Sequence, residues 1–111
     1  MRPILAAFLI LSTASTALAD EPILGKWRAP GGGIVEVTSC SAGFCATVIS
    51  GQHKGKDAGA MNGSDGVYAG SVTDPRDDKT YQGEAVIEGD VLKMTGCVLK
   101  VLCKTQRWTR V

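Results

Sequence analysis

The chain has 111 residues and nearly balanced charge, with 12 basic and 11 acidic side chains, so it has the length of one domain. A chain without a basic excess has nothing to hold a phosphate backbone, which argues against nucleic acid as a partner. Only 5% of the residues are aromatic, so a wide stacking surface for sugars or bases is not expected.

The N-terminus has the pattern of a secretory signal peptide. Arg2 supplies a basic start, an unbroken apolar run fills positions 4–11, and a small-residue cleavage site ends at Ala19. The run is shorter than the roughly 20 apolar residues of a transmembrane helix, and no cysteine follows the site to carry a lipid anchor. We therefore expect residues 1–19 to be removed near Ala19, and residues 20–111 to form one domain that is periplasmic or secreted.

Apolar and polar residues alternate with a period of two through much of the remaining chain, and no helical period is present. We predict β-strands over residues 25–29, 34–38, 45–49, 66–72, 80–88, 91–95 and 104–110. Turn-forming residues separate them at positions 30–33, 40–45, 74–78 and 89–90. The predicted fold class is all-β: a small antiparallel meander β-barrel of seven or eight strands, stapled by disulfides.

The strand count leaves one question open. In a simple meander the first and last strands are antiparallel only when the number of strands is even. Either an eighth strand lies within residues 50–65 or around 98–102, or the sheet does not close as a plain meander. Residues 50–65 are glycine-rich and show no periodicity, which is typical of a long functional loop or of an element that the pattern hides.

Four cysteines in an exported chain indicate two disulfides, and their spacing is wider than that of a usual zinc site. Cys40 and Cys45 would lie about 16 Å apart on a straight strand, whereas a disulfide tolerates about 7 Å between Cα atoms. We favour the local pairs Cys40–Cys45 and Cys97–Cys103, each around a chain reversal, with residues 98–102 as an exposed or capping loop. Crossed pairing stays open, because its longer closed loop would stabilise the fold more.

The sequence shows no catalytic or metal-binding pattern. His53 is the only histidine, which leaves no catalytic triad and no multi-histidine metal site. No C-x-x-C motif is present, and Asp74, Asp77 and Asp78 miss the spacing of a calcium loop. We therefore predict a protein that is not an enzyme and that needs no metal or cofactor.

Several short patterns together resemble a known family. They are Gly25-x-Trp27, the Cys40/Cys45 couple, Asp74-Pro75 with Lys79-Thr80-Tyr81, Leu92-Lys93 with Gly96-Cys97, and Thr105-Gln106-x-Trp108-x-Arg110-Val111. With these the chain is similar, over residues 24–111, to the exported bacterial family called domain of unknown function 2147, whose members are small envelope proteins without an established activity. The resemblance implies a lipocalin-like β-barrel. One departure is at residues 55–62, where many members carry an Asn-Pro-containing segment.

The first and last predicted strands look like the lipocalin arrangement in which an arginine of the last strand covers an early tryptophan. Alternation places Trp108 and Arg110 on one face of the last strand. A guanidinium over an indole contributes about 0.5–2 kcal/mol. We expect both tryptophans to be buried and Arg110 to lie near an indole. The expected structural barrel floor consists of Gly25, Trp27, Trp108 and Arg110.

These observations favour an exported, periplasmic and monomeric β-barrel that binds a small apolar ligand. The alternatives are a protein-interaction module, such as a periplasmic inhibitor of a wall-degrading enzyme, or an envelope protein of another role. A rigid barrel with one long polar loop commonly separates stability from recognition, so we expect the ligand or partner to contact residues 50–65. The candidate contact residues are His53, Lys54, Lys56, Asp57, Met61 and Asn62.

Overall fold

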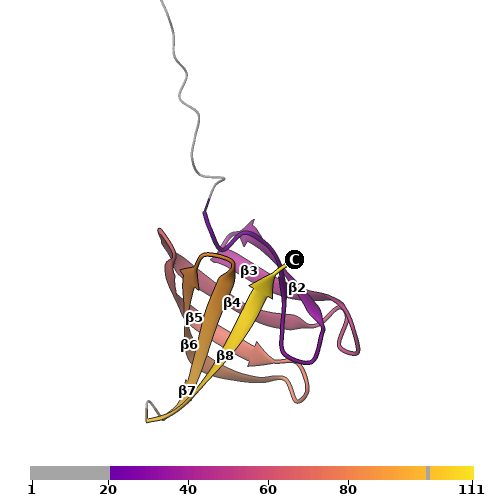
Figure 1. Cartoon of the computed structure of the whole chain (residues 1–111). Helices are drawn as coiled ribbons and strands as arrows, with labels where there is room; N and C mark the ends of the chain where they lie inside the picture. The colour runs from indigo at the N-terminus through magenta and orange to yellow at the C-terminus, as the bar shows by residue number, and fades with distance from the viewer. Residues whose placement is uncertain (1–20, 100) are drawn as a thin grey trace, which may run out of the picture.

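The computed structural model describes residues 21–99 and 101–111, so the predicted signal peptide and its cleavage site lie outside the described residues. Among the residues that are described, none belongs to a helix that could cross a membrane. Eight strands follow one another around a barrel (Figure 1). They are β1 (Gly25–Arg28), β2 (Ile34–Cys40), β3 (Gly43–Ser50), β4 (Asp57–Ser64), β5 (Val67–Asp74), β6 (Lys79–Glu88), β7 (Val91–Val98) and β8 (Leu102–Arg110).

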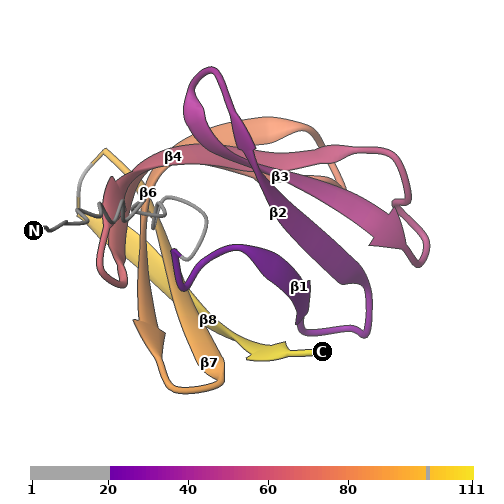
Figure 2. The same ribbon diagram turned by 90° about the horizontal axis from the view of Figure 1, so that it is seen from above.

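The barrel is a plain antiparallel meander that closes between its first and last strands, as the view from above in Figure 2 lets the reader follow. At the seam Trp27 lies opposite Arg110 and Arg28 lies opposite Thr109. The seam has two residue pairs, whereas β7 and β8 pair over eight. The predicted all-β closed barrel is confirmed, in its eight-stranded form.

The eighth strand lies within residues 50–65, one of the two places where the sequence allowed it. Residues 57–64 form β4, which pairs with both β3 and β5. The expectation of one long loop over residues 50–65 is therefore wrong, and only residues 51–56 form the connection. Small residues hide the alternation here. Gly59 has a φ of 143°, and a Cβ on it would collide with the carbonyl oxygen of Ser71, so only glycine lets β4 and β5 approach this closely.

One apolar core fills the barrel. Its largest fully buried side chains are Trp27, Tyr68 and Leu92, and Trp108 is 5% exposed. The predicted alternation along β8 is confirmed, because Trp108 is buried and its strand neighbours Arg107 and Thr109 are exposed. Both tryptophans are buried, as expected.

The two disulfides join local partners, Cys40 to Cys45 and Cys97 to Cys103, with Cα–Cα distances of 5.9 and 4.0 Å. The favoured pairing is confirmed and the crossed alternative is wrong. Each bridge ties the two strands of one hairpin together. Cys97 and Cys103 lie directly opposite each other in the β7–β8 ladder, and the sequence between the two strands contains no glycine, proline or asparagine.

Candidate functional site

One end of the barrel is closed by the short N-terminal segment before β1, which the last strand holds in place. The guanidinium carbon of Arg110 lies 3.9 Å from the ring centroid of Trp27. Its Nη1 donates to the carbonyl oxygen of Leu24 at 2.8 Å, and its Nη2 donates to that of Pro22 at 2.7 Å. The Trp27 indole donates to the Ile23 carbonyl at 2.9 Å. Arg110 therefore lies over the buried indole of Trp27, as expected, whereas Trp108 faces the interior cavity.

Gly25 belongs to this floor for a steric reason. A Cβ at that position would lie 2.9 Å from Nη1 of Arg110, and the backbone has a φ of 120°, which other residues rarely adopt. The glycine thus lets the arginine reach across the indole to the carbonyl groups beyond it.

A second set of hydrogen bonds, which the sequence did not predict, stabilises the N-terminal segment at the same end of the barrel. The hydroxyl of Tyr68 donates to Oε1 of Glu21 at 2.6 Å, and the backbone N–H of Asp65 donates to the same oxygen at 3.0 Å. Burial raises the pKa of the Tyr68 phenol to about 12, and the hydrogen bond to Glu21 adds to the rise. These contacts join the N-terminal segment to the β4–β5 hairpin at this end of the barrel.

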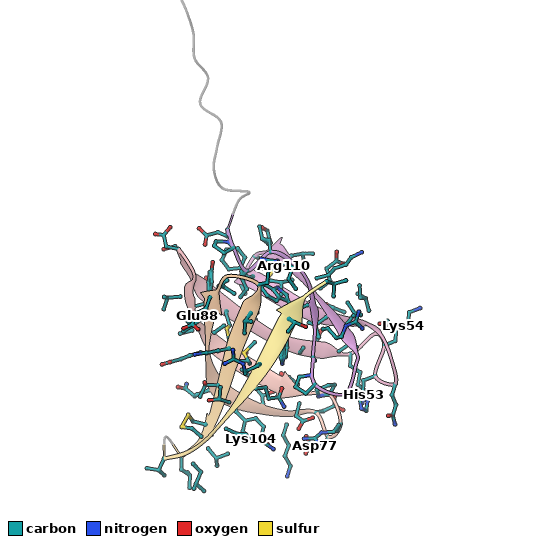
Figure 3. All side chains as sticks on the ribbon, viewed as in Figure 1. His53, Lys54, Asp77, Glu88, Lys104 and Arg110 are labelled. Carbon is teal, nitrogen blue, oxygen red and sulfur yellow. A yellow bond between two sulfur atoms is a disulfide. The ribbon has the colours of Figure 1, made fainter. Side chains whose placement is uncertain are left out.

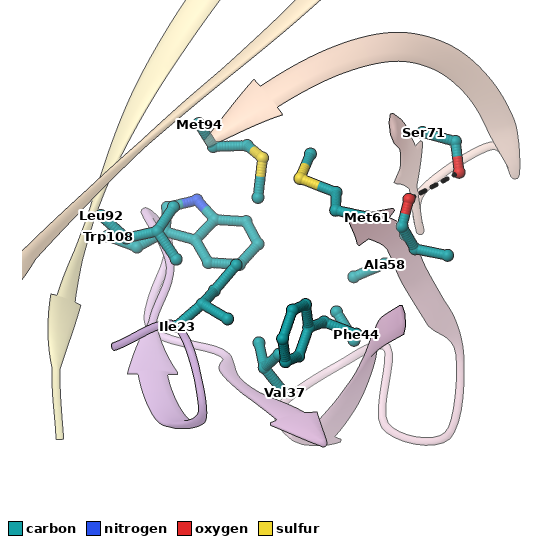
Figure 4. Close-up of a pocket in the computed structure, with 12 residues that line it drawn as sticks. Ile23, Val37, Phe44, Ala58, Met61, Ser71, Leu92, Met94 and Trp108 are labelled. Carbon is teal, nitrogen blue, oxygen red and sulfur yellow. Dashed lines mark hydrogen bonds between the residues drawn. The ribbon is translucent and has the colours of Figure 1, made fainter. Parts of the chain in front are cut away.

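The interior holds an apolar cavity of about 20 Å³, shown in Figure 4. A single water needs about 10–15 Å³, so the cavity is far smaller than an acyl chain or a sterol. The side chains of Met61 and Met94 face it together with the aromatic rings of Phe44 and Trp108. The interior is therefore almost filled by the protein itself.

The predicted contact residues of segment 50–65 do not form one site. His53 and Lys54 lie in the β3–β4 connection, and Lys56 donates to the Pro75 carbonyl at 3.2 Å and pairs with Asp78 at 3.4 Å. Asp57 begins β4, where it is exposed. Met61 is buried in the core, and Asn62 is exposed farther along the strand. The assumption that these six residues share one loop is therefore wrong, because β4 contains Asp57, Met61 and Asn62.

The outer surface carries a feature that the sequence analysis treated only as a loop. Four large hydrophobic side chains are exposed at the end of the β7–β8 hairpin: Val98 at 42%, Leu99 at 82%, Val101 at 75% and Leu102 at 69%. We call these four residues the apolar tip. The hairpin reaches the lower extremity of the molecule in Figure 1, and the side chains drawn there in Figure 3 point outward. Within residues 21–99 and 101–111, only Val67 and Val111 are other large hydrophobics with comparable exposure.

Charge is distributed unevenly around this hairpin. From Val91 to Arg110 the sequence has five basic side chains and no acidic one: Lys93, Lys100, Lys104, Arg107 and Arg110. Lys93 and Arg107 lie directly opposite each other in the ladder, and Glu88 pairs with Lys93 at 3.1 Å. All eleven carboxylate side chains belong to other parts of the chain.

The turn between β5 and β6 shows why its aspartates are structural. Arg76 donates from Nε and Nη2 to the two carboxylate oxygens of Asp74, at 3.0 and 2.6 Å. This hydrogen bonding lowers the pKa of Asp74 to about 2. Asp77 accepts from the backbone N–H of Lys79 at 3.0 Å. Among the described residues, no three His, Cys, Asp or Glu side chains converge in a way that could hold a metal ion.

Fold and site together define a small closed eight-stranded antiparallel barrel with two disulfides and a nearly filled interior. Residues 58–110 match the model of a family described as an uncharacterized protein conserved in bacteria (DUF2147). This confirms the family resemblance over that range. No curated protein and no solved structure matches the chain.

Proposed function

We propose that the protein is an exported, non-enzymatic envelope protein that binds its partner with its outer surface, at the end of the β7–β8 hairpin. The observation that carries this proposal is a contrast between interior and exterior. The interior cavity measures about 20 Å³, whereas four large hydrophobic side chains are exposed together at the apolar tip. Contiguous exposed apolar side chains are a common mark of a binding surface.

Export is supported by the leader pattern of residues 1–19 and by the disulfides. Both bridges need an oxidising compartment, because cytosolic thiols are kept reduced. A protein-interaction module of this kind, such as an inhibitor of a wall-degrading enzyme, would present the protruding hairpin rather than residues 50–65. The latter are mostly built into the barrel wall.

A small apolar ligand in the interior is the second candidate. It is favoured by the lining of the cavity, because Met61 and Met94 both belong to it. Methionine side chains are unbranched and adapt their shape readily, so the cavity could enlarge around a guest. This reading needs the core to repack, whereas recognition at the surface needs no change.

Native mass spectrometry of protein purified from the periplasm separates the two candidates. We expect the mass of residues 20–111 with both disulfides formed and no additional component. An added mass of ligand size that leaves only on unfolding would contradict the surface proposal and support the interior ligand. A full-length chain with four free thiols, found in the cytosol, would refute export.

A further inference from the structure

The β7–β8 hairpin changes in character along its length. Near the floor its outer face carries Lys93 opposite Arg107. In the middle the hydroxyls of Thr95 and Thr105 are hydrogen-bonded at 2.9 Å. The Cys97–Cys103 bridge follows, and the apolar tip ends the hairpin. Basic groups therefore lie behind a small apolar end, with no carboxylate side chain on either strand.

A disulfide and a backbone hydrogen bond hold the base of the apolar tip. The bridge joins the two strands immediately below Val98 and Leu102, and the N–H of Val101 donates to the carbonyl of Val98 at 3.3 Å. Leu99 has a φ of 57°, a left-handed conformation that glycine or asparagine adopts far more readily than leucine. A polar or small residue would form this turn more easily. The leucine is thus unfavourable for the turn itself, and its 82% exposure leaves it without core contacts.

Like charges directly opposite each other destabilise an antiparallel pair, so the Lys93–Arg107 pair is also unfavourable for the isolated fold. Glu88 compensates Lys93, and Glu84, on the neighbouring strand β6, lies beside Thr95 in the ladder. Arg107 and Lys104 remain exposed on β8. The exposed leucine and the pair of like charges both become favourable in contact with a partner that has an apolar interior and an anionic surface.

We propose that the apolar tip inserts into an anionic lipid bilayer, with the exposed Lys104 and Arg107 of β8 facing the lipid headgroups. This inference rests on the proposed function in one respect, since it takes the outer surface as the binding site. A bilayer fits the shape because the tip is a narrow protrusion, which needs no matching cleft. It fits the charge because lysine and arginine favour anionic headgroups while leucine and valine enter the acyl boundary.

Co-sedimentation with vesicles tests the proposal. The mature protein is mixed with vesicles of phosphatidylethanolamine and phosphatidylglycerol, and in parallel with neutral vesicles of phosphatidylcholine. We expect binding to the anionic vesicles, weakening as salt rises, and much weaker binding to the neutral ones. Protein that stays in the supernatant with anionic vesicles at low salt would overturn the inference while leaving the proposed surface recognition intact.

The variant L99N/L102T replaces the two leucines of the apolar tip by polar residues. Asparagine suits the left-handed backbone at position 99 and threonine suits a strand, so we expect folding to survive, as melting and intact disulfides would verify. Vesicle binding should fall about tenfold or more. The matched control is V67T, which removes an exposed valine near the floor and should bind as the parent does. Equal binding by L99N/L102T and the parent would contradict insertion of the tip.

Insertion itself is read from a tryptophan placed at the tip. Trp27 and Trp108 are buried in the barrel, so a lipid-dependent change in the emission of V101W reports the new residue. Brominated lipids should quench V101W and leave V67W unquenched. Quenching of V67W alone would show that the floor end of the barrel enters the membrane, which would contradict the proposal. If L99N/L102T instead abolishes a self-association seen by sedimentation velocity without any lipid binding, the tip joins two copies of the chain and the lipid proposal is wrong.

Discussion

Replacing Arg110 by alanine removes the residue that connects the last strand, the first tryptophan and the N-terminal segment. The change deletes a guanidinium 3.9 Å from the Trp27 ring centroid, a contact of about 0.5–2 kcal/mol. It also deletes two charge-assisted hydrogen bonds to the carbonyl groups of Pro22 and Leu24. Such bonds contribute about 1.5–3 kcal/mol each when buried, and less here because Arg110 is half-buried. We expect a total loss of about 2–4 kcal/mol.

The assay is thermal and urea unfolding of the disulfide-intact protein. In a domain of this size each kcal/mol lowers the midpoint by about 4–8 °C, so R110A should melt roughly 10–25 °C below the parent. The matched control is R107A, which removes the same side chain from the same strand but from its exposed face. Its free energy of unfolding should change by less than about 0.5 kcal/mol. Similar midpoints for R110A and R107A would refute the structural role of the floor.

Two further predictions concern the floor and β4. Because burial raises the pKa of Tyr68 from 10.0 to about 12, the folded state keeps a proton that the unfolded state loses. The resulting stabilisation, about 2–3 kcal/mol, is complete below pH 10 and is lost as the pH rises to about 12. Unfolding of the parent and of Y68F across this range should show the difference, and equal slopes would contradict it. Shortening residues 52–55 to a glycine-serine turn should leave the melting midpoint within about a few degrees of the parent's, because loop length affects stability only weakly. Deleting residues 57–64 should instead abolish folding, because it removes β4 from the barrel. A folded deletion variant would show that β4 is dispensable.

Much of the fold could be predicted because most strands carry a clear pattern. Around Ala85 and around Leu92 the sequence predicts that every second side chain faces inward, and Gly83, Ala85, Leu92 and Met94 are the buried ones. The position of Arg110 followed from the same alternation, because it shares a face with Trp108. The local disulfides could be favoured because Ser41 to Gly43 readily reverse the chain.

The parts that escaped prediction depend on contacts or on small residues. β4 contains Ala58 and Met61 as its buried residues, with a glycine and an alanine between them, so neither a period of two nor a bulky apolar run is visible. Glu21 and Tyr68 are 47 positions apart, and nothing local indicates that they meet. The apolar residues at the end of the β7–β8 hairpin were visible in the sequence, whereas their exposure depends on the fold.

In vivo photo-crosslinking tests most directly whether the hairpin end is the binding surface. A photoreactive amino acid is placed at position 101 on the apolar tip, and in a matched strain at position 67, where the native valine is 62% exposed near the floor. After irradiation of intact cells, mass spectrometry identifies the adducts. We predict an adduct of lipid mass at position 101 and none at position 67. A defined protein adduct at position 101 would keep surface recognition and exclude the bilayer as partner. Adducts at position 67 alone, or at neither position, would contradict the account.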